Sequence, residues 1–94
     1  MTYSIKLSAR AKRSLRKLAH SGTFKKEKLE KALTCLENGV PLPSSYTDHA
    51  LSGALSNFRE CHLGFDLLLL YSRTEKPNTI IIVAIGTHTE LFGE

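Results

Sequence analysis

The sequence predicts a small α+β protein in which a pair of helices packs on a mainly antiparallel sheet, in the order β-α-α-β-β-β. Three observations lead to this prediction. The first half has two stretches with apolar residues at helical spacing, the second half has three runs of strand-forming residues, and only short turns separate those runs. Strands joined by short turns pair antiparallel. At 94 residues the chain is expected to form one domain, residues 1–94.

The first half of the chain is expected to contain one strand and the two helices. Apolar and polar residues alternate over Tyr3–Leu7, which is the pattern of a half-buried strand. Ser8 is expected to cap a helix that runs to about His20. After a short break, Thr23 is expected to cap a second helix, and Gly39 provides its C-terminal stop.

The second half is expected to supply the rest of the sheet. Three strands are predicted, at Asn57–His62, Asp66–Ser72 and Thr79–Ile85. Leu67–Leu70 is apolar on both faces, so this strand should lie centrally, beneath the helix pair. Residues 86–94 are expected to form a turn or one helical turn.

Charge is distributed unevenly along the chain. Residues 1–31 carry ten bases and two acids, whereas the remaining residues carry three bases and seven acids. Five of the bases gather on the polar side of the first predicted helix: Arg10, Lys12, Arg13, Arg16 and Lys17. A region this basic favours a polyanion or an acidic protein as its partner. A Lys-rich helical face exposed to solvent explains the charge equally well.

Several classes of protein are excluded by simple counts. The longest apolar runs fall far short of the ~20 residues that a membrane helix requires. The N-terminus lacks the apolar stretch of a secretory signal, so we expect a cytoplasmic protein. Two cysteines are too few for a disulfide framework.

Three of the four histidines lie beside chain breaks in the second half, where catalytic side chains are often found. His49 falls in a loop, His62 at the end of a strand and His88 just past another strand. Asp66 begins the strand after His62, so a hairpin should bring these two together. Imidazoles with one carboxylate suit general acid–base catalysis, because free histidine titrates near pH ~6.5.

Other interpretations of these residues stay open. Three histidines and one aspartate have the right ligand types for zinc, although no two of the histidines stand two or four residues apart. They are also consistent with three unrelated surface histidines. A nucleophilic Cys61 paired with His62 is excluded, because neighbouring residues on a strand point to opposite faces.

Three motifs at these positions resemble a known family. They are Asp-His-x-Leu-x-Gly at Asp48–Gly53, Arg-x-x-His at Arg59–His62, and Gly-Thr-His-x-x-Leu-Phe-Gly at Gly86–Gly93. Together they are similar to the YafQ branch of the RelE-type bacterial toxins, the toxin halves of type II toxin–antitoxin pairs. The resemblance covers nearly the whole chain. It implies the RelE-like microbial ribonuclease fold and a ribosome-dependent endoribonuclease that cleaves mRNA in the A site. It also implies an antitoxin partner.

The resemblance carries five site positions onto this sequence: His49, His62, Asp66, His88 and Phe92. The chain departs from the family at two places. Leu67 follows the aspartate, where close relatives often have Trp. The Arg that some relatives place shortly before Gly86 is missing, with Val83–Ile85 in that stretch, which leaves phosphate stabilisation to Arg59 or the histidines.

The resemblance and the residues predict the same mechanism. A base takes the proton of the RNA 2′-OH, and an acid protonates the leaving 5′-oxygen, so no metal or cofactor is expected. His49, assisted or replaced by Asp66, is our candidate for the base, and His88 for the acid. His62 and Arg59 would stabilise charge on the phosphorane. Phe92 would stack on a base of the message.

The basic helix and two further functions complete the predictions. Lys12, Arg13, Arg16 and Lys17 are expected to bind ribosomal RNA phosphates. One alternative is a RelE-fold toxin of the ParE type, which acts on DNA gyrase. The other is a non-catalytic RNA- or protein-binding module whose histidines are incidental.

Overall fold

The computed structural model describes residues 2–22 and 24–93. Its strands are β1 (Ser4–Leu7), β2 (His49–Ala50), β3 (Arg59–Gly64), β4 (Leu67–Thr74) and β5 (Thr79–Gly86). Its α-helices are α1 (Ala9–Ala19), α2 (Lys26–Glu37) and α3 (His88–Phe92), with 3₁₀ turns at Ser44–Tyr46 and Gly53–Leu55. The predicted α+β fold, a helix pair on a mainly antiparallel sheet, is confirmed.

The strands form one five-stranded sheet in the order β1-β5-β4-β3-β2. β2, β3, β4 and β5 pair antiparallel in succession, and β1 joins β5 in parallel. The prediction that Leu67–Leu70 lies centrally is confirmed, because β4 is the middle strand. The edge strand β2 was not predicted, since a pair of residues is too short to show an alternating pattern.

Local signals in the sequence explain where the two long helices begin and end. The Ser8 side chain accepts a hydrogen bond from the backbone N–H of Ala11 at 3.0 Å, as its predicted capping role requires. Thr23 lies outside the described residues, and α2 starts after Lys25, whose side chain makes no capping hydrogen bond. Gly39 adopts φ 68° after α2 and donates its N–H to the carbonyl of Leu36, which confirms the predicted stop.

The hairpin between β3 and β4 differs from the prediction. The predicted strands end at His62 and begin at Asp66, which leaves residues 63–65 for the turn, whereas the observed turn is Phe65–Asp66 and Gly64 pairs with Leu67. The strand continues to Gly64 because Leu63 is buried in the core, which preserves the alternation of faces. Asp66 therefore lies in the turn itself, before β4 begins.

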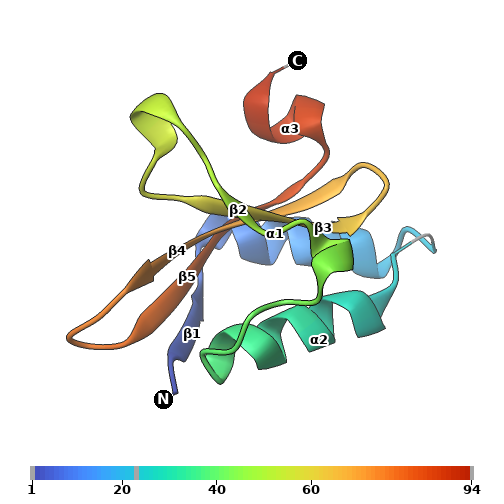
Figure 1. Cartoon of the computed structure of the whole chain (residues 1–94). Coiled ribbons are helices and arrows are strands. Elements are labelled where there is room, and N and C mark those ends of the chain that lie inside the picture. Colours follow the sequence, from blue (N-terminus) through green and yellow to red (C-terminus); the bar gives the residue numbers. More distant parts are fainter. Residues whose placement is uncertain (1, 23, 94) are drawn as a thin grey trace.

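The two faces of the sheet have different coverings. On one, which we call the helix face, α1 and α2 pack over residues such as Leu69, Tyr71 and Ile82 (Figure 1). On the other, which we call the site face, α3 and the loop after β2 lie at the border (Figure 1). Within the described residues, no helix is long and apolar enough to cross a membrane.

Candidate active site

Three histidine rings form a row on the site face. His49 comes from β2, His62 from β3, and His88 from the first residue of α3. The ring centroids of His49 and His62 lie 6.5 Å apart, and those of His62 and His88 lie 6.3 Å apart. Phe92 extends the row, with its ring 6.4 Å from that of His88. A substrate with two reacting oxygens would fit along such a row.

His88 is held by Asp66 through one ring nitrogen. The Nδ1 atom of His88 lies 2.8 Å from Oδ1 of Asp66, and the backbone N–H of His88 donates to the same oxygen at 3.1 Å. These hydrogen bonds, first the side-chain one and then the backbone one, lower the pKa of Asp66 below its usual value. An ionised Asp66 requires a proton on Nδ1, so the Nε2 atom of His88 remains available for proton transfer.

The start of α3 fixes where His88 stands. The Thr87 hydroxyl accepts from the N–H of Glu90 at 3.1 Å, and the Glu90 carboxylate accepts from the N–H of Thr87 at 2.8 Å. This capping box starts α3 directly after β5. A Cβ at Gly86 would come within 2.9 Å of the Glu90 carboxylate, which would have to shift from the position in which it accepts from Thr87. His88 is thereby presented at the end of β5.

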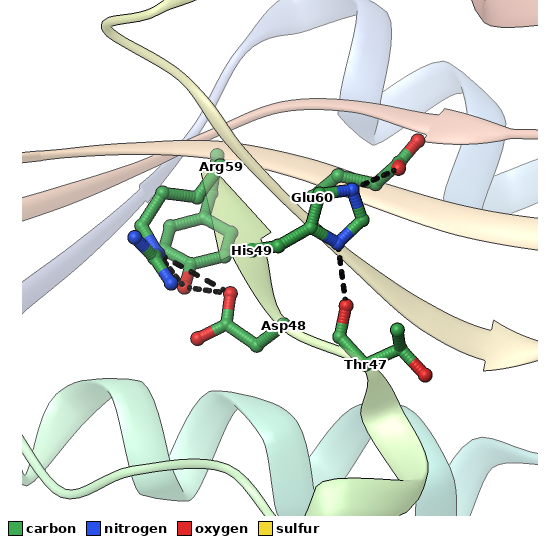
Figure 2. Close-up of polar contacts among 6 residues, drawn as sticks. Thr47, Asp48, His49, Arg59 and Glu60 are labelled. Atoms are coloured by element: carbon green, nitrogen blue, oxygen red, sulfur yellow. Dashed lines mark hydrogen bonds and ion pairs between the residues drawn. The ribbon is translucent and has the colours of Figure 1, made fainter. Parts of the chain in front are cut away.

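His49 differs from His88 in that both of its ring nitrogens face acceptors. Its Nδ1 lies 2.7 Å from the Thr47 carbonyl oxygen, and its Nε2 lies 3.1 Å from Oε2 of Glu60 (Figure 2). Glu60 is directly opposite His49 in the β2–β3 register. In this arrangement His49 has no free nitrogen with which to accept a proton.

His62 lies between the other two histidines. Among the described residues, its ring has no side-chain or backbone hydrogen-bond partner, so its nitrogens are available. The neighbouring Cys61 faces the helix side and is fully buried, and burial raises the pKa of its thiol to about 12. The opposite orientations of Cys61 and His62 agree with the exclusion of a nucleophile–base pair.

Arg59 is not brought together with the histidines. Its Nε atom lies 3.3 Å from Oδ1 of Asp48 and also donates to the Tyr71 hydroxyl, while that hydroxyl donates to Asp48 at 2.7 Å. Figure 2 shows Asp48 with Arg59 on one side of the β2 ribbon and His49 with Glu60 on the other. Burial, together with the Asp48 hydrogen bond, raises the pKa of Tyr71, so the hydroxyl keeps the proton that it donates.

Four of the five basic residues of α1 were predicted to bind RNA; all four are exposed, and α1 lies on the helix face of the sheet (Figure 1). They are Lys12, Arg13, Arg16 and Lys17. One link connects α1 to the site, because Arg10 donates to the carbonyl oxygen of Glu90 in α3 at 2.9 Å. The basic surface and the row of histidines are therefore separate regions joined at one edge.

Sequence reasoning missed two parts of the site. Glu60 was not selected, although its position two residues before His62 places both on one face of a strand. The anchor that Tyr71 provides for Asp48 joins β4 to the loop before β2, and no local pattern signals it. Among the described residues, no group of three or more His, Cys, Asp or Glu side chains is arranged to hold a metal ion. The absence of a metal from the reaction stays a prediction.

Comparison with known proteins agrees with this arrangement. A family model described as the bacterial toxin of type II toxin–antitoxin system, YafQ, matches residues 3–93. An mRNA interferase toxin YafQ from Escherichia coli K12 is 37% identical over 78 residues, which cover 82% of this chain and 83% of the relative.

Solved structures give the same result. A metal-bound toxin from Helicobacter pylori superposes with a TM-score of 0.87 and 39% identity, covering 98% of this chain and 100% of that one. The toxin in the E. coli DinJ–YafQ toxin–antitoxin complex superposes with a TM-score of 0.83 and 33% identity, covering 99% and 100%. Fold and sequence thus define a toxin of the type II toxin–antitoxin class. Within that class, the chain belongs to the YafQ family.

Proposed function

We propose that this chain is an endoribonuclease that cleaves mRNA in the ribosomal A site by activating the RNA 2′-OH. The observation that supports this most strongly is the row of three histidines. One of them, His88, is paired with the exposed Asp66. The relatives named mRNA interferase toxin point to the same reaction.

The hydrogen bonds favour a division of roles along the row. His62 takes the proton of the 2′-OH, because its ring nitrogens are unengaged, whereas both nitrogens of His49 are bound. The 2′-oxygen then attacks the adjacent phosphorus. His88 donates a proton from Nε2 to the leaving 5′-oxygen, with Asp66 stabilising its charged ring. The products are a 2′,3′-cyclic phosphate and a 5′-hydroxyl. This differs from the sequence-based choice of His49 or Asp66 as the base.

Substrate contacts follow from the same geometry. Phe92 stands beside His88, where its ring can stack on a base of the message. Arg59 is engaged with Asp48, so charge on the phosphorane is met by the histidines instead. The exposed bases of α1 bind ribosomal RNA phosphates, an interaction that carries little sequence information.

Regulation by an antitoxin is part of the proposal. The E. coli DinJ–YafQ complex is a toxin bound to its antitoxin, and this chain matches the toxin over nearly its whole length. A cognate antitoxin that binds this chain and blocks cleavage is expected by analogy.

The reaction needs no metal in this mechanism, since the nucleophile belongs to the RNA itself. Cleavage of ribosome-bound message should survive exhaustive EDTA treatment, with magnesium returned only to keep the ribosome assembled. Activity that required added zinc would contradict this part of the proposal.

Expression without an antitoxin, followed by pulse labelling, tests the function as a whole. Protein synthesis should stop first, and His88→Ala should relieve the arrest. If DNA synthesis stopped first while translation continued, the gyrase-directed alternative would replace this one. Growth arrest that His88→Ala left intact would favour a non-catalytic binding module.

A further inference from the structure

Glu60 is a buried carboxylate with no role in the proton transfers proposed above. It is 6% exposed, and its cross-strand neighbours are His49 on β2 and the apolar Leu70 on β4. Its Oε2 atom lies 3.1 Å from Nε2 of His49. Among the described residues, no other side chain forms an ion pair or hydrogen bond with it. A buried carboxylate is costly unless a positive partner compensates it.

The hydrogen bonds of His49 determine how many protons its ring carries. Nδ1 lies 2.7 Å from the Thr47 carbonyl oxygen, which only accepts, so Nδ1 must carry a hydrogen. An ionised carboxylate also only accepts, so Nε2 requires a hydrogen toward Glu60. A ring protonated at Nδ1 alone would direct a nitrogen lone pair at a carboxylate oxygen. Opposite an ionised Glu60, the arrangement is therefore satisfied by a doubly protonated, positively charged ring, whereas a protonated Glu60 that donated to Nε2 would leave the ring neutral, and the measurement below distinguishes the two.

The other groups around His49 leave Glu60 as its counter-charge. On the site face, the neighbouring ring is His62, with a centroid distance of 6.5 Å. The adjacent Asp48 is directed to the helix face, where Arg59 and Tyr71 bind its carboxylate. Glu60 and the Thr47 carbonyl together fix the position of the ring, and an ionised Glu60 would compensate a positive charge on it.

We infer that Glu60 is a positioning residue that holds His49 as a fixed positive charge beside His62. This rests on the proposed function. In that reaction His49 stabilises the negative charge that develops on the phosphorane, while the neighbouring His62 accepts the proton of the 2′-OH. Glu60 touches neither RNA nor the reacting atoms and acts through His49.

The ring nitrogens of His49 report the inference directly. In the full chain labelled with ¹⁵N-histidine, His49→Asn identifies the signals of this ring. At neutral pH the native chain should show both nitrogens protonated. In Glu60→Gln one of them should lose its proton, because a neutral amide no longer requires a charged partner. The signals of His20, at the far end of α1, show whether the variant is folded.

Cleavage in the same variants connects the ring to the reaction. Glu60→Gln should slow single-turnover cleavage of ribosome-bound message about 10²-fold, a common cost of losing one charge-stabilising group, with ribosome binding unchanged. Glu60→Asp should restore part of the rate. The matched control is Glu75→Gln, which removes the same charge where the carboxylate only accepts from the Tyr3 hydroxyl, and it should change neither measurement.

Three results would overturn the inference. They are a singly protonated His49 ring in the native chain, a ring in Glu60→Gln that stays doubly protonated, and unchanged cleavage by that variant. A native chain that does not cut ribosome-bound message would instead overturn the proposed function. The ring spectra would then still show whether Glu60 holds His49 in its charged form.

Discussion

The two faces of the sheet have different tasks, although the same strands build both. On β3, Arg59, Cys61 and Leu63 point to the helix face, and Glu60 and His62 point to the site face. The helix face contains the apolar core, and beyond it lie the exposed bases of α1. The site face carries the histidines and their carboxylates. Neighbours in the sequence therefore contribute to the core on one side and to the proposed chemistry on the other, so the two faces should respond separately to substitution.

The largest expected effect is on the site face. His88→Ala removes the proposed acid and should slow single-turnover cleavage roughly 10²–10⁴-fold, the usual range for losing a general acid or base. Ribosome binding should stay nearly unchanged, because the proposed docking residues lie on α1, on the helix face of the sheet. Co-sedimentation with ribosomes, measured beside the cleavage rate, checks both. Loss of ribosome binding in this variant would contradict the assignment of binding and cleavage to different faces of the sheet.

The reciprocal change is on α1. Replacing Lys12, Arg13, Arg16 and Lys17 by Gln should weaken ribosome binding and flatten its dependence on salt. The slope of log affinity against log salt should fall by about one for each RNA phosphate that the variant no longer binds. Co-sedimentation across a salt series measures it, with His88→Ala as the variant that keeps the native slope. Normal binding combined with failed cleavage would contradict the docking role.

A smaller effect is expected from the residue that anchors the chain before β2. Tyr71→Phe removes the hydroxyl that donates to Asp48 at 2.7 Å beside His49. The free energy of unfolding should fall by about 1.5–3 kcal/mol, as for other hydrogen bonds to charged groups. Urea titration measures it. Tyr3→Phe is the control, since its hydroxyl donates to a solvent-exposed carboxylate, and it should change stability by less than about 0.5 kcal/mol. Equal losses in both variants would show that Tyr71 is no special anchor.

The smallest effect concerns pH. The pKa of Asp66 is lowered in the folded chain by its hydrogen bonds from His88. A lowered folded pKa means that the contribution to stability is present above the unfolded value of about 3.9 and is lost as pH falls through the folded value. The difference in unfolding free energy between the native chain and Asp66→Asn, measured by urea titration at several pH values, should therefore shrink on acidification. A difference that grew on acidification would mean that folding raises the pKa of Asp66 instead of lowering it.

Most of the fold follows from local signals in the sequence. The cap at Ser8, the stop at Gly39 and the apolar run at Leu67–Leu70 each act over a few residues, and each was interpreted correctly. The exceptions depend on tertiary contacts. β2 is defined by its pairing with β3. The hairpin turn lies at Phe65–Asp66, later than predicted, because Leu63 is buried in the core and remains part of β3.

The candidate site could be predicted less completely. The histidines stood out by residue type and by their positions next to chain breaks. Their partners did not, since a hydrogen bond depends on side-chain direction across strands that are distant in sequence. The hydrogen bond of Asp66 to His88 was not expected, and neither was the position of Glu60 opposite His49 in the β2–β3 register. Arg59 was expected at the site and instead binds Asp48.

The central claim is that the site face activates the 2′-OH of the message, and a message that lacks this group tests it directly. Ribosomes would be programmed with an mRNA carrying a single 2′-deoxynucleotide on the 5′ side of the cut bond, and with its all-ribose counterpart. The account predicts that the ribose message is cut to a 2′,3′-cyclic phosphate end and a 5′-hydroxyl end, and that the deoxy message stays intact at that bond. Cleavage of the deoxy message there, or a 5′-phosphate end, would contradict it.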